Sequence, residues 1–240
     1  MKTLRIALLA SLATVAVSAQ ATVFLFCGQD AVNFTNDPRP VSNAAFAQWA
    51  VIAGSNASIS FATFENQAIN AQNGLMGPGM NVSSTNNSAT HGVLDTDDVI
   101  LGFNSTPGGR KHYRLDSDDN TNPVVMTFNF ADPINSFGAW FSGVGTAAGI
   151  AEIEWTNSLG VQKIVLGELS GGSIQFCGFV DLNEAFTQVR VQLLPDSGGI
   201  LDEFGVDDVG YSNCNPVPEP ASISAIVIGL AALARRKRKA

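Results

Sequence analysis

The sequence predicts an all-β fold, a β-sandwich of the jelly-roll type. Short runs of β-branched and aromatic residues recur along the chain; in the clearest, residues 124–130, Val124, Met126, Phe128 and Phe130 alternate with polar or small side chains. Clusters of glycine, proline and asparagine separate these runs and predict tight turns. The amphipathic helices that an α/β fold needs between its strands are missing from the pattern. We therefore expect one sandwich domain over residues 22–214.

The expected strands follow one another along this domain. Their ranges are 22–26, 57–64, 99–103, 112–115, 124–130, 137–142, 150–156, 161–166, 173–180, 187–194 and 204–211. Phe46, Trp49 and Ile52 have helical spacing, which fits a short surface helix over residues 43–52, but we favour the alternative that they are only core contacts. The polar stretch 66–91 predicts a long mobile loop, where binding sites often lie.

The first 21 residues predict a secretory signal peptide. Two basic residues precede the apolar run 6–17, and Ala19-Gln20-Ala21 forms an Ala-x-Ala cleavage site. We expect cleavage after Ala21, with cleavage after Ala19 as the alternative.

The last 26 residues, 215–240, form a tail in three parts. A proline-rich break and the uncharged run 221–234 precede a basic cluster of Arg235, Arg236, Lys237, Arg238 and Lys239. As a helix, the uncharged run would extend about 21 Å, short of the roughly 30 Å hydrocarbon core, so it predicts a weak transmembrane span. The positive-inside rule keeps the basic cluster in the cytoplasm and places the preceding domain across the membrane.

Val217, Pro218, Glu219 and Pro220, followed by this hydrophobic segment and basic end, resemble the PEP-CTERM sorting signal of Gram-negative bacteria that produce exopolysaccharide. The resemblance implies recognition by an exosortase at the inner membrane, cleavage near the motif, and delivery to the cell surface or extracellular matrix. An ordinary C-terminal membrane anchor is the alternative. Both ends of the chain therefore predict export.

The part of the chain between the two targeting segments is strongly acidic. Residues 1–21 and 221–240 hold seven of the 13 Lys and Arg residues and none of the 21 Asp and Glu residues, which leaves residues 22–220 with a formal charge of −15. Such a surface repels nucleic acid and anionic lipid and attracts divalent cations. We expect no nucleic-acid partner.

Three cysteines, Cys27, Cys177 and Cys214, enter an oxidising compartment on export. One disulfide and one free thiol is the simplest arrangement, and all three pairings stay open. A Cys27–Cys214 bond would join the two ends of the domain, whereas Cys177 lies in an apolar run that fits a buried free thiol.

Two acidic segments lie near the ends of the domain, Glu65 within Phe64-Glu65-Asn66 and the pair Asp207 and Asp208. Together they resemble the carbohydrate-binding-module type of jelly roll, in which a Phe-Glu segment and an Asp-Asp pair meet around a structural calcium. The resemblance implies Glu65 and one of the two aspartates as calcium ligands. Strand alternation puts Asp207 and Asp208 on opposite faces, so we expect only one to face the site. Solvated strand ends are the alternative.

A second acidic group is a candidate calcium loop. Asp116, Asp118 and Asn120 match the first, third and fifth ligand positions of an EF-hand, but Thr121 replaces the glycine of the sixth position and Thr127 the glutamate of the twelfth. The sequence fits a loose calcium loop or a plain turn rich in Asp and Asn, and we favour the turn.

Catalytic motifs are scarce. The chain has two histidines, and it lacks a His-x-x-x-His pair, a Gly-x-Ser-x-Gly elbow and a phosphate-binding loop. Glu152 and Glu154 share one face of a strand, and with Glu65 they are the candidates for a glycan hydrolase. Aromatic candidates for sugar stacking are Trp49, Tyr113, Trp140 and Trp155, with core burial as the default.

We therefore predict an exported, non-enzymatic protein of the cell surface or the polysaccharide matrix, with a structural or adhesive role. Calcium-dependent binding of extracellular polysaccharide is the accompanying hypothesis. A secreted polysaccharide-active hydrolase and a matrix protein without a ligand are the alternatives.

Overall fold

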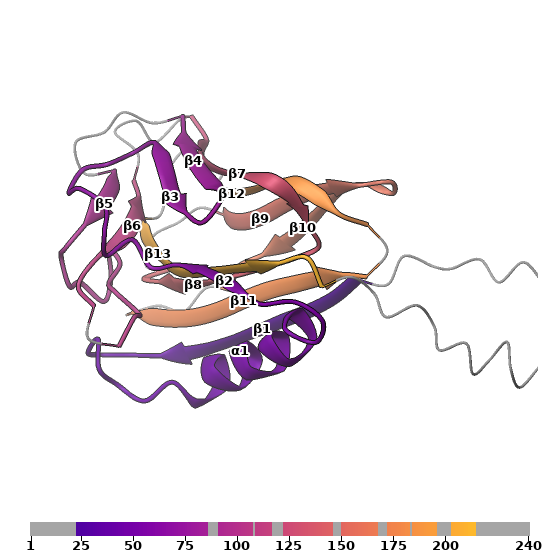
Figure 1. The fold of residues 1–240 in the computed structure, drawn as a ribbon. Coiled ribbons are helices and arrows are strands. Elements are labelled where there is room, and N and C mark those ends of the chain that lie inside the picture. Colours follow the sequence, from indigo (N-terminus) through magenta and orange to yellow (C-terminus); the bar gives the residue numbers. More distant parts are fainter. Residues whose placement is uncertain are drawn as a thin grey trace, which may run out of the picture.

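The computed structural model describes residues 23–85, 91–107, 109–116, 122–145, 150–167, 172–182, 184–195 and 203–214. Two antiparallel sheets face each other in a β-sandwich, which confirms the predicted fold class (Figure 1). The predicted signal peptide and the predicted hydrophobic helix of the tail lie outside the described residues. Among the residues that are described, no helix is long and apolar enough to cross a membrane.

One sheet has the strand order β1-β11-β8-β13-β6-β5, with β2 also paired to β13; the second has the order β10-β9-β12-β7-β4-β3. The strands of the first sheet are β1 (Val23–Ala31), β2 (Ser60–Ala62), β5 (Gly92–Leu94), β6 (His112–Leu115), β8 (Ser136–Ser142), β11 (Ser173–Asp181) and β13 (Phe204–Ser212). Those of the second are β3 (Gly74–Gly77), β4 (Met80–Ser84), β7 (Val124–Ile134), β9 (Ile150–Asn157), β10 (Gly160–Val165) and β12 (Phe186–Leu194).

Two predictions about the strands are wrong. Residues 66–91 are not one loop, because β3 and β4 form a hairpin at the edge of the second sheet. Met80 and Val82 of β4 face the core, but the surrounding asparagines and glycines hide this short alternation in the sequence. Residues 99–103 form a turn instead of a strand, since the Asp98 carboxylate accepts the backbone N–H groups of Ile100 and Leu101.

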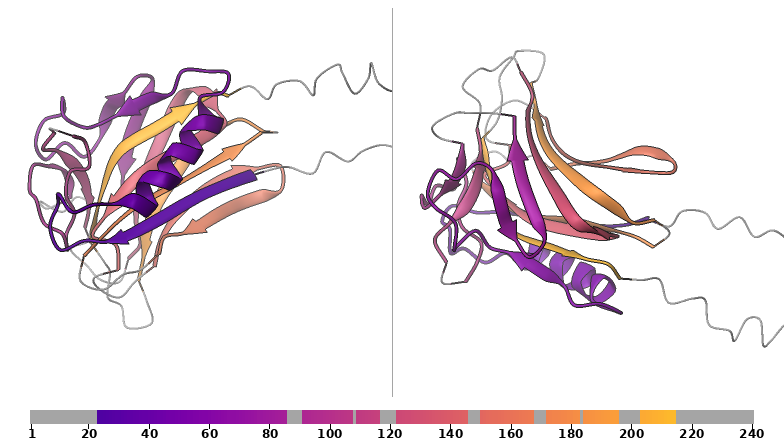
Figure 2. Two further views of the ribbon diagram at one scale, coloured as in Figure 1. Left: turned by 90° about the horizontal axis from the view of Figure 1, so that it is seen from below. Right: turned by 45° about the horizontal axis from the view of Figure 1, so that its top comes forward.

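The one helix of the described residues, α1 (Pro40–Ala53), lies across the outer face of the first sheet (Figure 2). The favoured interpretation, that the aromatics of this segment make core contacts without a helix, is therefore wrong. Pro40 is suited to the first turn, where its missing N–H costs nothing. The carboxylate of Asp30 on β1 accepts hydrogen bonds from the backbone N–H groups of Val41 and Ser42 and from the Ser42 hydroxyl. This contact satisfies helix donors that would otherwise lack partners and fixes α1 to β1.

Trp49 anchors α1 on a row of three glycines. Gly178 on β11 pairs with Gly138 on β8, which pairs with Gly210 on β13. A Cβ atom at any of these glycines would lie within 3.1 Å of the Trp49 indole, so glycine at these positions leaves room for the ring to approach the sheet closely. The indole N–H donates to the carbonyl oxygen of Phe179. The helix therefore closes a second apolar core outside the one between the sheets.

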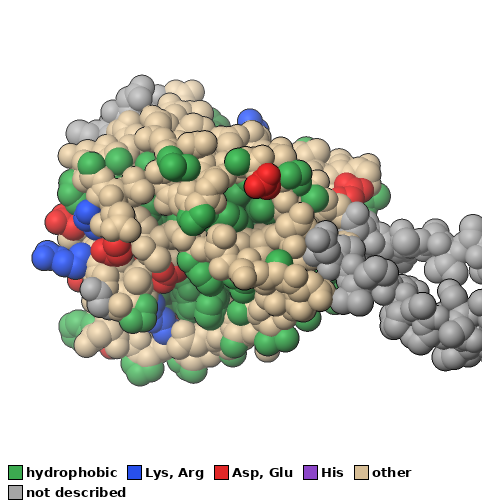
Figure 3. All heavy atoms as spheres, viewed as in Figure 1, with side chains coloured by type: hydrophobic (Ala, Val, Ile, Leu, Met, Phe, Trp, Pro, Cys, Tyr) green, Lys and Arg blue, Asp and Glu red, His purple; other side chains and the backbone are tan. Residues whose placement is uncertain are grey.

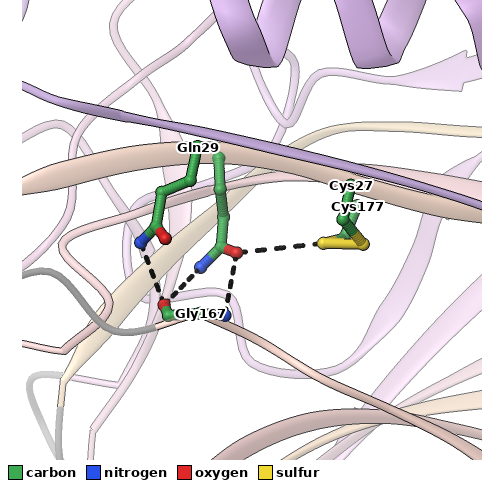
Figure 4. The surroundings of a disulfide bond; sticks show 5 residues. Cys27, Gln29, Gly167 and Cys177 are labelled. Carbon is green, nitrogen blue, oxygen red and sulfur yellow. Dashed lines mark hydrogen bonds between the residues drawn. A yellow bond between two sulfur atoms is a disulfide. The ribbon is translucent and has the colours of Figure 1, made fainter.

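The disulfide joins Cys27 to Cys177 (Figure 4). The two residues are direct partners on β1 and β11, which brings their Cα atoms to 4.3 Å. Cys214 is the buried free thiol, packed in the core under α1. One disulfide and one free thiol are present, as expected, and of the three pairings that the sequence left open the antiparallel pairing of β1 with β11 selects Cys27–Cys177 over Cys27–Cys214. Beside the bond, Gln29 donates to the Gly167 carbonyl and ties β1 to the segment after β10.

Candidate binding pocket and the carboxylates beside it

A β-bulge shapes the acidic part of β13. The register of β13 against β8 shifts between Asp207 and Gly210, and Asp208 has a positive φ of 46°. The bulge breaks the strand alternation, so Ser105 Oγ lies 3.0 Å from Asp207 Oδ2 and 3.1 Å from Asp208 Oδ2. The prediction that only one of the two carboxylates faces this region is wrong for that reason.

Asn104 connects these aspartates to Glu65. Its Nδ2 atom lies 2.8 Å from Glu65 Oε1 and 3.1 Å from Asp207 Oδ2. Glu65 Oε1 also accepts the backbone N–H groups of Arg110 and Lys111, each at 2.9 Å. The two acidic segments singled out in the sequence thus meet through one polar loop, although they are far apart along the chain.

Asp207 is a buried carboxylate with a strongly raised pKa. It is 1% exposed, and burial together with the negative charge of Asp208 raises the pKa of Asp207 to about 8. Oδ2 is within hydrogen-bonding distance of five donor atoms of residues 104–106, whereas the buried Oδ1 has no hydrogen-bond partner among the described residues. Burial also raises the pKa of Asp208. A proton or a cation at Oδ1 would relieve this arrangement.

The calcium ligands named from the sequence do not form a complete cage. No group of three or more His, Cys, Asp or Glu side chains arranged to hold a metal occurs in the described part of the chain. Asp116 is buried, with Arg114 Nη2 4.0 Å from its carboxylate, whereas Asp118 and Asn120 lie outside the described residues. Calcium binding stays a prediction, and the support it has from this structure is Asp207 Oδ1.

A pocket of about 450 Å³ opens beside the carboxylates, between α1 and β2. Three aromatic rings form its wall: Phe46 lies 5.9 Å from Trp140 and 6.3 Å from Phe61, measured between ring centroids. In Figure 3 a recess with a hydrophobic floor and charged side chains at one end is visible above α1. The pocket is lined by Arg39, Asn43, Phe46, Phe61, Ser105, Pro107, Trp140 and Asp208.

The polar end of this pocket is built from Arg39, Asn43 and Asp208. The Arg39 guanidinium lies over the Trp140 ring, 5.6 Å from its centroid. Burial lowers the pKa of Arg39, while the negative charges of Asp208 and Asp207 act in the opposite direction. The Asn43 amide is exposed and makes no side-chain hydrogen bond within the described residues. Polar groups that fix orientation beside apolar walls are typical of small-ligand pockets.

The stacking candidates named from the sequence have different positions. Trp49, Tyr113 and Trp155 are buried in the cores, whereas Trp140 is 7% exposed and reaches the pocket wall. Phe46 and Phe61 were not among the candidates. The helical spacing of Phe46 and Trp49 was the only sequence signal for this site.

Glu152 and Glu154 lie on the outer face of the second sheet. Both ion-pair with Lys163, and Gln192 Nε2 donates to both. Arg190 Nη1 lies 3.6 Å from Glu154. Both carboxylates therefore already have cationic and amide partners in the structure.

A comparison with known protein families identifies the motif in the tail of the chain. Residues 216–239 match the family described as the PEP-CTERM protein-sorting motif. The match confirms the resemblance seen in the sequence, indicates an exported protein with a transient membrane stage, and implies processing by an exosortase. A search of curated proteins finds no match.

The solved structures that match this chain include carbohydrate-binding modules. A family 29 module, a CBM29-2 point mutant complexed with cellulohexaose, is 12% identical and covers 66% of this chain and 92% of its own, with a TM-score of 0.37. The family 32 module from C. perfringens NanJ in complex with galactose is 12% identical, covering 55% and 93%, with a TM-score of 0.32. The K2 cleaved adhesin domain of Lys-gingipain is 13% identical, covering 65% and 98%, with a TM-score of 0.40. Similarities this low carry no conclusion about function.

Proposed function

We propose that this chain is an exported, non-enzymatic protein of the cell surface or extracellular matrix that binds a glycan in the pocket between α1 and β2. The observation that carries the proposal is the combination of a wall of three aromatic rings with a charged and amide-bearing end in one open pocket. Its role in the matrix is structural or adhesive.

The chemistry of the pocket fits a sugar. Aromatic faces pack against the apolar C–H surface of a pyranose ring, and Arg39, Asn43 and Asp208 supply donors and acceptors for its hydroxyl groups. The charge of −15 on residues 22–220 disfavours a polyanionic glycan, because long-range repulsion opposes its approach. A neutral sugar is therefore the ligand class we propose.

Isothermal titration calorimetry with neutral saccharides tests this site. Phe46→Ala and Asn43→Ala should each weaken binding about tenfold, since each removes a pocket wall or a directed hydrogen bond. Gln48→Ala is the matched control, because Gln48 is exposed on the same helix outside the pocket. Equal binding by all three variants would show that the pocket is not the site.

The hydrolase alternative makes a different prediction. A binding protein releases no reducing ends from the glycan it binds, whereas a hydrolase releases them and loses this activity on Glu152→Gln or Glu154→Gln. The ion pairs to Lys163 disfavour the hydrolase, because both carboxylates already have a cationic partner in the structure.

Calcium is a separate part of the proposal. A calcium ion at Asp207 Oδ1 would satisfy a buried carboxylate oxygen that has no partner among the described residues. The melting temperature should then rise on adding calcium chloride and fall back with EDTA, and Asp207→Asn should remove the effect. If calcium leaves the melting temperature of the wild type unchanged, the calcium site is rejected and the proposed glycan site is not affected.

A further inference from the structure

We infer that the glycan is a linear, neutral chain of at least three sugar units that crosses Phe61 into a second pocket between β2 and β3. The inference rests on the proposed function and names its ligand class. The second pocket has a volume of about 420 Å³, and Phe61 is the residue common to both linings. It is lined by Phe61, Ala62, Thr63, Phe64, Asn66, Gln67, Leu75, Met76, Gly77 and Pro78.

Phe61 separates the two pockets. Its neighbour Ala62 is buried in the core between the sheets, so strand alternation turns Phe61 to the outer face, where it is 40% exposed. Its cross-strand partner is Gly210, and a Cβ atom there would lie 2.9 Å from Phe61 Cε1. The absence of a side chain at Gly210 thus lets the Phe61 ring pack directly on the sheet. An exposed ring that is packed on the sheet between two pockets can stack against a sugar unit that lies between the units bound in the two pockets.

The second pocket is preformed. Gly77 brings β3 against β2, since a Cβ atom there would lie 2.9 Å from Ala62 Cβ. The Tyr211 hydroxyl donates to the Pro78 carbonyl at 2.6 Å and holds the β3–β4 turn in place. Both contacts join the two sheets at this edge, so a ligand does not have to order the pocket when it binds.

The composition of the second pocket favours an uncharged sugar. Phe64 and Met76 are buried at its base, and Leu75 is 63% exposed at its rim. Thr63, Asn66 and Gln67 provide hydroxyl and amide groups, and no acidic or basic side chain is among the described residues that line it. The Asn66 amide is exposed and makes no hydrogen bond within the described residues.

A single chain explains both pockets better than two separate ligands. Two separate ligands would compete for the one Phe61 ring, whereas a linear chain places one unit in each pocket and one over the ring. Linking the units makes the later contacts intramolecular, so affinity should rise steeply with length until both pockets are filled.

Calorimetry with linear glucose, mannose and galactose oligosaccharides of one to six units tests this inference. For the series bound best, affinity should rise at least tenfold from the monosaccharide to the trisaccharide and then level off. Phe61→Ala should abolish this rise and Phe61→Tyr should keep it. Asn66→Ala should weaken the trisaccharide but not the monosaccharide. Phe24→Ala is the matched control, because Phe24 is 41% exposed on β1 and lines neither pocket.

The outcomes separate the two proposals. A monosaccharide that binds as tightly as the hexasaccharide leaves the pocket beside α1 as a binding site and overturns the extension across Phe61. Absence of binding by all three series overturns both. If Phe61→Ala unfolds the protein, Asn66→Ala still decides, because the Asn66 side chain is exposed and makes no hydrogen bond within the described residues. An unchanged length dependence in that variant refutes the extension.

Discussion

Removal of the Cys27–Cys177 disulfide is the sharpest test of how β1 is held. The bond links residues 150 positions apart and so closes a long loop in the unfolded chain. The chain-entropy relation gives about 5 kcal/mol at 25 °C for a loop of this length, and structure remaining in the reduced unfolded chain lowers that value. Among the described strands β1 pairs with β11 alone, so few other strand contacts replace the bond. We expect the double variant Cys27→Ser, Cys177→Ala to lose about 3 to 5 kcal/mol of unfolding free energy.

Urea unfolding of the exported form, followed by tryptophan fluorescence, measures this loss. Alanine is chosen at position 177 because Cys177 is 1% exposed and a buried hydroxyl would add its own cost. Reduced wild type should resemble the double variant, and Cys214→Ala should keep the response to reductant. The reasoning fails if oxidised, reduced and double-variant proteins unfold at one urea concentration, or if peptide mapping finds Cys214 in the bond.

Three further predictions concern the first sheet. Gly210→Ala should cost about 1 to 3 kcal/mol, because its Cβ would lie 2.6 Å from Trp49 Cη2, and urea unfolding checks this. Burial lowers the pKa of His112 to about 4, so between pH 6.5 and pH 4 the unfolded chain binds a proton that the folded chain does not. The free energy of unfolding should therefore fall as the pH drops through this range. In His112→Phe the urea concentration at the midpoint of unfolding should depend less on pH over the same range. The raised pKa of Asp207 has the opposite sign: stability should fall as the pH rises from 4 to 8, and Asp207→Asn in EDTA should raise the melting temperature at pH 7.

The sandwich could be predicted because some of its strands, above all residues 124–130 of β7, alternate between buried and more exposed side chains. On β7, Val124, Met126, Phe128 and Phe130 all face the core, as the period of two requires. The hairpin of β3 and β4 was missed because an edge strand needs few apolar residues on either face. The helix was undervalued because its burial depends on the glycine row under Trp49, and nothing in the sequence shows that three distant glycines lie side by side.

The candidate site could be predicted only in part. Glu65 and the Asp207–Asp208 pair stood out by composition, and the structure joins them through Asn104. The bulge that turns both aspartates toward Ser105 is a property of how β13 pairs with β8, and strand alternation alone gives the wrong answer there. The pocket itself draws its wall from separate segments, so it exists only after α1 has packed on the sheet.

The bulge also connects the carboxylates to the pocket. Asp208 and Ser105 line the pocket, and Ser105 contacts Asp207 as well. A proton or cation at Asp207 therefore changes the charge felt at the pocket wall, since the pKa of Asp207 depends on Asp208. Binding free energies are reciprocal, so a cation that alters glycan affinity must have its own affinity altered by the same factor. Glycan titrations with and without calcium thus report on both proposals at once. Identical affinities would show that cation binding at the carboxylates is not coupled to glycan binding in the pocket.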